Sequence, residues 1–193
     1  TAGGVEIIRW AKARGIAVTA EVTPHHLLLT DESAKSYDPI YKVNPPLRSA
    51  ADVEALREGL ADGTIDIVAT DHAPHPAESK ECEWQYASFG MLGLETALPI
   101  VWQTMIETKL LNLSQLQQRM SIVPAQIGRY QMQGKGVIKG APANLTLFNP
   151  NVSWKVDRDL VASKSKNTPF HGMELSGSVH ATFFNGRLVW SRK

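Results

Sequence analysis

Apolar positions at the start of the chain fall first at helical spacing and then in a continuous run. Between Gly4 and Gly15 they recur every three or four residues, which predicts a helix. The β-branched run 16–23 then predicts a strand that ends before Pro24. A short extended stretch is predicted at 41–44, where two prolines follow.

The order of a helix followed by a strand repeats once more before residue 70. Ser49 with Asp52 is typical of a helix start, and Gly63 is a natural helix end, so a second helix is predicted between them. The apolar run 65–69 predicts a buried strand that stops just before Asp71. Helix, strand, helix and strand in this order favour a parallel α/β sheet or barrel.

The middle of the chain combines a polar loop with helical patterns. Residues 76–90 are polar and irregular, and a loop this long in a compact domain is usually functional. Residues 92–109 predict a helix despite Pro99. Residues 113–130 predict one or two further helices, interrupted at Pro124.

From Gln131 onward the pattern changes to short β-type runs punctuated by glycine. These runs cover residues 137–138, 144–148, 152–156, 179–184 and 187–190. Asn185-Gly186 between the last two is a strong signal for a hairpin turn. We therefore predict an α/β part over residues 1–131 and a small β domain over residues 132–193.

Composition excludes several classes of protein. The 193 residues carry a formal net charge of +1, so there is no basic surface expected for nucleic acid, and no apolar run is long enough to span a membrane. Cys82 is the only cysteine, which rules out an intrachain disulfide and fits a reducing, cytoplasmic location. The chain begins at Thr1 in what reads as a loop, which suggests a fragment lacking an N-terminal part.

Candidate chemistry lies where the strand 65–69 ends. Asp71, His72 and His75 follow it within six residues, which places ligand-type side chains at the open end of a sheet. A solvated strand end would have the same local pattern. Two further motifs also follow predicted strands, namely 23–27 with 44–46, and 88–96. All three motifs could therefore share one face of a barrel.

Together these motifs carry a resemblance to a known family. The runs are "VTAEVTPHHLLLTDE", "KVNPPLRS", "ATDHAPH", "FGMLGLETALP" and "SKSKNTPFHGMELSGSV". In this order they resemble the dihydroorotases of the long bacterial type, within the cyclic amidohydrolase superfamily, over essentially the whole chain. The resemblance implies an α/β fold: the C-terminal part of a metal-dependent (β/α)8 amidohydrolase barrel plus a small C-terminal β-sandwich part.

The resemblance also implies an activity and roles for five residues. The activity is the reversible, zinc-dependent cyclisation of N-carbamoyl-L-aspartate to dihydroorotate, with one or two zinc ions in the complete enzyme. Asp71 would bind the metal and transfer the proton as general base and acid. Asn44 and His75 would hold polar groups of the substrate, while Phe89 and Gly90 would present backbone groups to the pyrimidine ring.

The other metal ligands of that family would lie before Thr1. Asp71 alone cannot hold a catalytic zinc, which needs about three protein ligands. His25 and His26 do not replace them, because adjacent residues on a strand point to opposite faces, so we interpret both as structural.

Two other readings stay open. Another cyclic amidohydrolase, such as a hydantoinase or allantoinase, would share the barrel. A non-catalytic dihydroorotase-like subunit that scaffolds aspartate transcarbamoylase would also match, although Asp71, Asn44 and His75 are all present. The partners implied are the small-molecule substrate, with a homodimer or aspartate transcarbamoylase possible.

Overall fold

The structure is a computed structural model that describes residues 1–192. Both helices predicted in the first 63 residues are confirmed. Helix α1 (Ala2–Ala13) begins at Thr1, whose hydroxyl accepts the Gly4 N–H, and helix α3 (Ala50–Asp62) begins at the predicted cap Ser49. Gly63 ends α3 with a φ of 90°, a conformation that glycine adopts without strain.

The two predicted strands form a parallel pair that is shorter than expected. Strand β1 (Glu21–Val22) pairs with β2 (Ile67–Val68) in parallel. Just before this pair, the Asp66 carboxylate accepts the Ala20 N–H at 2.8 Å, while the Ala20 carbonyl still accepts the Asp66 backbone N–H at 2.9 Å. One more parallel bridge joins residues 72 and 91 beyond the end of β2.

The segment between β1 and α3 contains three short helical elements and forms no strand. Thr23 caps the short helix α2 (Pro24–Leu28), and two 3-10 turns follow, η1 (Asp31–Ser36) and η2 (Pro39–Tyr41). His25 and His26 therefore lie on a helix. The strand geometry used to separate them in the sequence does not apply, because a proline at the first helical position with a threonine cap starts a helix.

The helices predicted over 92–109 and 113–130 are present but shorter, and each continues into a π-helical turn. Their elements are α4 (Ala97–Val101), η4 (Trp102–Ile106), α5 (Leu113–Gln117), η5 (Gln118–Ile122) and α6 (Val123–Ile127). Pro99 lies in the first turn of α4, where backbone N–H groups have no partner within the helix, so it does not break that helix. Pro124 comes just after the π-helical turn η5, and the helical run continues through it into α6. The loop before α4 contains only one 3-10 turn, η3 (Ala77–Ser79).

Residues after 144 form one antiparallel sheet of order β3-β4-β5 among the described residues. The strands are β3 (Leu145–Lys155), β4 (Glu174–Phe184) and β5 (Arg187–Ser191). Two runs predicted as separate strands are halves of β3, joined across an irregularity between Asn149 and Ser153. The hairpin at Asn185-Gly186 is confirmed, with both residues at positive φ. The predicted run 137–138 is not a strand.

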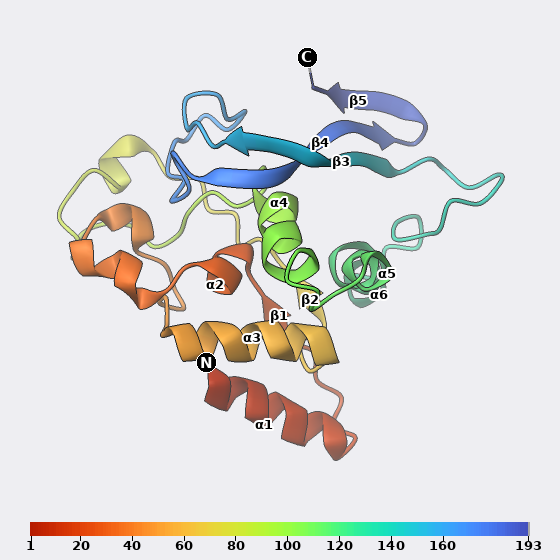
Figure 1. Cartoon of the computed structure of the whole chain (residues 1–193), viewed down its shortest axis with the longest axis horizontal. Helices are drawn as coiled ribbons and strands as arrows, with labels where there is room; N and C mark the ends of the chain where they lie inside the picture. Colours follow the sequence, from red (N-terminus) through yellow and green to blue (C-terminus); the bar gives the residue numbers. More distant parts are fainter. Residues whose placement is uncertain (193) are drawn as a thin grey trace.

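The elements stack in a continuous series. Helix α1 packs on α3, α3 on α2, α2 on α4, and α4 on β4, so the antiparallel sheet and α1 lie at opposite ends of the molecule (Figure 1). Among residues 1–192, no helix has the length and apolar character needed to cross a membrane.

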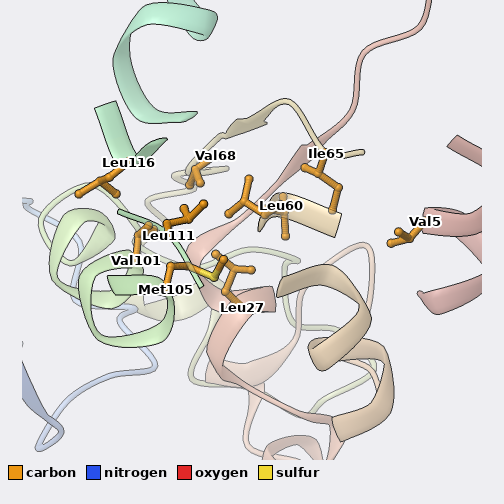
Figure 2. Packing of buried hydrophobic residues seen from close by; sticks show 10 residues of the cluster. Val5, Leu27, Leu60, Ile65, Val68, Val101, Met105, Leu111 and Leu116 are labelled. Atoms are coloured by element: carbon orange, nitrogen blue, oxygen red, sulfur yellow. The ribbon is translucent and has the colours of Figure 1, made fainter. Parts of the chain in front are cut away.

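Two clusters of buried side chains hold this stack together. The first surrounds the parallel strand pair (Figure 2) and contains Val5, Val22, Leu27, Leu60, Ile65, Val68, Val101, Met105, Leu111 and Leu116. The second contains Leu29, Val43, Leu47, Met91, Ile100, Val156, Phe170 and Leu175. It joins residues on both sides of position 131, so the two predicted parts share buried apolar surface. Their division into domains stays a prediction.

We expect this chain, when it is produced on its own, to associate in solution. Strand β1 has a neighbouring strand on one side only among the described residues, and β5 exposes Leu188, Val189 and Trp190. Unpaired edges and exposed apolar side chains favour pairing with other chains. Light scattering after size-exclusion chromatography should show mass rising with concentration, and Val189→Lys should reduce that rise. A monodisperse monomer that melts cooperatively would contradict this prediction.

Candidate active site

Asp71 lies just beyond the end of β2 in an unusual backbone conformation. Its φ is 46°, in the left-handed region that asparagine and aspartate tolerate better than other residues with a side chain. The residue is exposed, so its carboxylate is accessible from outside the chain. The backbone turn after the strand thus presents a carboxylate at the carboxyl end of a parallel sheet, where α/β proteins usually bind ligands.

An open cleft of about 610 Å³ lies at this position. Its walls come from the end of β1, from α2, from the turn after Val43 and from Asp71; they comprise Thr1, Glu21, Val22, Thr23, His26, Asn44, Pro45, Pro46, Arg48, Leu56 and Asp71. Two predicted site residues, Asn44 and Asp71, therefore line the same cleft although 27 positions separate them in the chain.

His26 joins two walls of this cleft. Its Nε2 lies 3.0 Å from the Pro45 carbonyl oxygen, and its Nδ1 lies 2.7 Å from the Thr23 hydroxyl. Because a carbonyl only accepts, Nε2 carries the proton and Nδ1 accepts from the hydroxyl. Burial lowers the pKa of His26, which favours this neutral form. Both ring nitrogens are occupied within the protein, which supports the structural interpretation of this histidine.

His25 points away from the cleft into the protein interior. It is 1% exposed, its Nε2 has no hydrogen-bond partner within the described residues, and its ring lies 4.5 Å from that of His26. Burial, together with the neighbouring His26, lowers the pKa of His25 to about 3. The ring is therefore neutral at physiological pH.

Three other predicted residues form a second group beside the first. His75 Nε2 donates to the Phe89 carbonyl oxygen at 2.8 Å. Gly90 has a φ of 118°, and a Cβ there would approach Ala73 Cβ to 2.5 Å, so only glycine fits. His75, Phe89 and Gly90 thus contact one another, but they do not line the 610 Å³ cleft.

His72 connects these two groups. Its Nδ1 accepts the N–H groups of Gly93 and Leu94 at 3.1 and 3.3 Å. This bond attaches the 88–96 motif to the residue directly after Asp71. The three motifs found in the sequence are therefore held at one end of the parallel strand pair.

Asn167 is a site residue to which the sequence assigned no role. It is buried, its amide donates to the Ala73 carbonyl at 2.8 Å, and its Oδ1 accepts the His75 N–H at 3.1 Å. It thereby fixes the backbone on both sides of Pro74. The run "SKSKNTPF" contains it and is part of the family resemblance, but no local pattern places it beside His75.

The residues present do not by themselves form a metal site. Among residues 1–192, no three histidine, cysteine, aspartate or glutamate side chains are grouped so that they could hold a metal ion. Asp71 offers one carboxylate, and His26 is engaged on both nitrogens. Since a catalytic zinc takes about three protein ligands, the described residues do not fit a zinc ion on their own.

Comparisons with known proteins agree in one family. Residues 2–189 match the Amidohydrolase family. The dihydroorotase of Streptomyces coelicolor is 60% identical over 187 residues, covering 97% of this chain and 44% of that protein. The dihydroorotase of Mycobacterium tuberculosis is 52% identical over 188 residues, with 97% and 44% covered.

Solved structures give the same answer for the fold. The L-hydantoinase (dihydropyrimidinase) of Arthrobacter aurescens superposes with a TM-score of 0.91 at 35% identity, covering 98% of this chain and 43% of that one. The chain spans less than half the length of the relatives it matches. With a family match over residues 2–189 and an α/β structure of the same kind, this chain belongs to the amidohydrolase family.

Proposed function

We propose that this chain supplies part of a dihydroorotase, which interconverts N-carbamoyl-L-aspartate and dihydroorotate. The observation that carries the proposal is the meeting of Asp71 and Asn44 in one cleft at the carboxyl ends of the parallel strands. Identities of 46–60% to dihydroorotases over nearly the whole chain support it. Because the chain covers about 44% of those relatives, the activity belongs to a longer arrangement of residues.

The same proposal extends to the fold. Residues 1–131 would form the C-terminal portion of a (β/α)8 barrel, and residues 132–193 would form part of a β-sandwich. Support comes from the parallel pairing of β1 with β2 and from the separate antiparallel sheet. A homodimer or aspartate transcarbamoylase as partner, and a cytoplasmic location, belong to the same proposal.

Within the cleft, each proposed residue has a distinct task. Ring opening needs a group that removes a proton from the attacking water and returns it to the leaving amide nitrogen, and the exposed Asp71 carboxylate suits that exchange. The Asn44 amide, which lines the same cleft, would orient the substrate. Arg48 in the same cleft adds a positive charge, which favours a substrate that carries a carboxylate.

Zinc is the metal we propose for the complete site. Asp71 would contribute one ligand, and the remaining ligands would come from residues outside this chain. When bound, the ion would supply a hydroxide nucleophile at neutral pH. His75 and the backbone of the Phe89–Gly90 segment would bind the substrate beside it, with Gly90 allowing close approach of the chain.

A hydantoinase is the second candidate, because the L-hydantoinase (dihydropyrimidinase) of Arthrobacter aurescens, at 35% identity, superposes closely on this chain. A hybrid enzyme, in which this chain replaces the matching 187-residue segment of the Streptomyces coelicolor dihydroorotase, distinguishes the two. We expect turnover of dihydroorotate and little turnover of a 5-substituted hydantoin lacking a carboxylate. The reverse preference would favour the hydantoinase.

In the hybrid enzyme, His75→Ala should weaken substrate binding and leave zinc content unchanged. Loss of one hydrogen bond to a charged group costs roughly 1.5–3 kcal/mol, or about ten- to a hundredfold in kcat/KM. His180→Ala, on the exposed face of β4, is the matched control and should behave like the unsubstituted enzyme. Kinetics with metal analysis would check both variants, and a loss of zinc in His75→Ala would contradict the role given to His75.

A further inference from the structure

The loop 76–90 contains one of two buried lysines that have no acidic partner. Lys42 is 7% exposed and Lys80 is 6% exposed. Neither forms a salt bridge within residues 1–192. A buried charge without a counterion is costly unless hydrogen bonds replace the water it has lost, so the partners of these two ammonium groups are informative.

Backbone carbonyls take the place of carboxylates. Lys80 Nζ donates to the carbonyl oxygens of Ser88 at 2.9 Å, Gly90 at 3.0 Å and Lys42 at 3.3 Å. Lys42 Nζ donates to the carbonyls of Trp84 at 2.7 Å and Gln85 at 3.2 Å. It also lies 4.6 Å from the centre of the Phe89 ring. The two ammonium groups thus bind four backbone carbonyls of the loop 76–90, those of residues 84, 85, 88 and 90.

These bonds determine which backbone groups near Phe89 remain available. The Phe89 carbonyl is bound by His75, the Gly90 carbonyl by Lys80, and the Gly90 N–H donates to the Lys42 carbonyl at 2.9 Å. Of the four polar backbone groups at Phe89 and Gly90, only the Phe89 N–H has no partner within the described residues. His75, Lys80 and the Lys42 carbonyl together leave the Phe89 N–H for an acceptor on a ligand.

We propose that Lys80, supported by Lys42, is a positioning residue that holds the Ser88–Gly90 backbone in the conformation that presents the Phe89 N–H to substrate. The proposal rests on the proposed function, because the loop is taken as one wall of the dihydroorotate site. Lys80 acts through the loop backbone and through His75, which binds the carbonyl between the two that Lys80 binds.

The energetics indicate that Lys80 orients backbone carbonyls and does more than fill space. Burial, followed by repulsion from Lys42, lowers the pKa of Lys80 to about 8. A methionine of similar length would fill the same space without that cost. What methionine lacks is the set of donors that turn three carbonyls inward. Hydrogen bonds between an ammonium group and carbonyls are stronger than neutral ones, so their loss should let the loop sample other conformations.

The test compares Lys80→Met, Lys80→Gln and the exposed control Lys139→Met in the hybrid enzyme. Without these bonds, only a fraction of the enzyme molecules would hold the loop in the conformation that binds dihydroorotate. The apparent affinity for dihydroorotate falls with that fraction, while proton transfer at Asp71 is unaffected. We expect Lys80→Met to raise KM for dihydroorotate about ten- to a hundredfold, with kcat changed less than about threefold. Lys80→Gln keeps two donors and should show a smaller rise. Lys139→Met should show none.

Hydrogen–deuterium exchange gives a readout that does not depend on turnover. Amides of residues 84–91 should exchange faster in Lys80→Met than in the control, while those of α3 stay unchanged. An unchanged KM, or a fall in kcat at unchanged KM, would overturn the proposal. If the unsubstituted hybrid enzyme lacked dihydroorotase activity, the proposed function would be wrong. Exchange alone would then decide whether Lys80 anchors the loop: faster exchange supports the anchor, and unchanged exchange overturns it.

Discussion

Replacing Asp71 with asparagine should lower kcat of the hybrid enzyme by about a thousandfold, in line with the roughly 10²–10⁴-fold contribution of a positioned acid–base group. The amide cannot take up and return a proton at the carboxylate position. Asparagine is also the matched replacement for the backbone, because it tolerates the φ of 46° found at this residue. The loss of activity should therefore not be accompanied by unfolding.

Two controls separate chemistry from structure in this experiment. Asp159→Asn changes an exposed carboxylate that does not line the cleft and should leave kcat unchanged. Asp71→Ala should lose activity as well, with an added cost of roughly 1–2 kcal/mol because alanine is strained at positive φ. Steady-state kinetics and thermal melts would be measured for all three. Near-normal turnover by Asp71→Asn would show that the proton carrier is another group.

The second large effect concerns the chain by itself. Alone, it should show no dihydroorotase activity and retain little zinc after dialysis, because the described residues group fewer than three metal-binding side chains. The hybrid enzyme should retain about one zinc or more per chain and turn over dihydroorotate. Atomic emission analysis and a ring-closure assay on N-carbamoyl-aspartate would test both proteins.

Chelation provides an internal check on this difference. Removing the metal from the hybrid enzyme should abolish turnover, and added zinc should restore it, while neither treatment should change the isolated chain. About one tightly bound zinc in the isolated chain, together with activity, would mean that the ligands lie within these 193 residues after all.

Local signals were sufficient for several elements and for one part of the site. Ser49 and Gly63 marked the ends of α3, and Asn185-Gly186 marked the β4–β5 hairpin, since caps and tight turns depend on nearest neighbours in the chain. The placement of Asp71 after a buried strand was read from the apolar run before it. Such signals are local, so they survive without knowledge of the rest of the fold.

Where the prediction failed, a neighbouring side chain or a cap changed the local structure. Residues 16–20 were predicted as strand, but regular strand pairing begins only at Glu21. At Ala20 the Asp66 carboxylate binds the N–H, and only the carbonyl has a backbone partner. His25 and His26 were treated as strand residues, but Thr23 and Pro24 start a helix there. The two halves of β3 were predicted as separate strands because the irregularity between them interrupts the alternating pattern.

The sequence by itself determined the class of this protein: an α/β segment followed by β structure, with the motifs of an amidohydrolase at its strand ends. Only the tertiary structure showed that Asn44 and Asp71 share a cleft, that Asn167 holds His75, and that Lys42 and Lys80 donate to backbone carbonyls of the loop 76–90. The physical reason is the distance along the chain over which each kind of interaction acts. Periodicity, caps and turns act within a few residues, whereas these contacts join positions up to 92 apart, and a lysine in a polar loop shows no sign of burial until its carbonyl partners are in place.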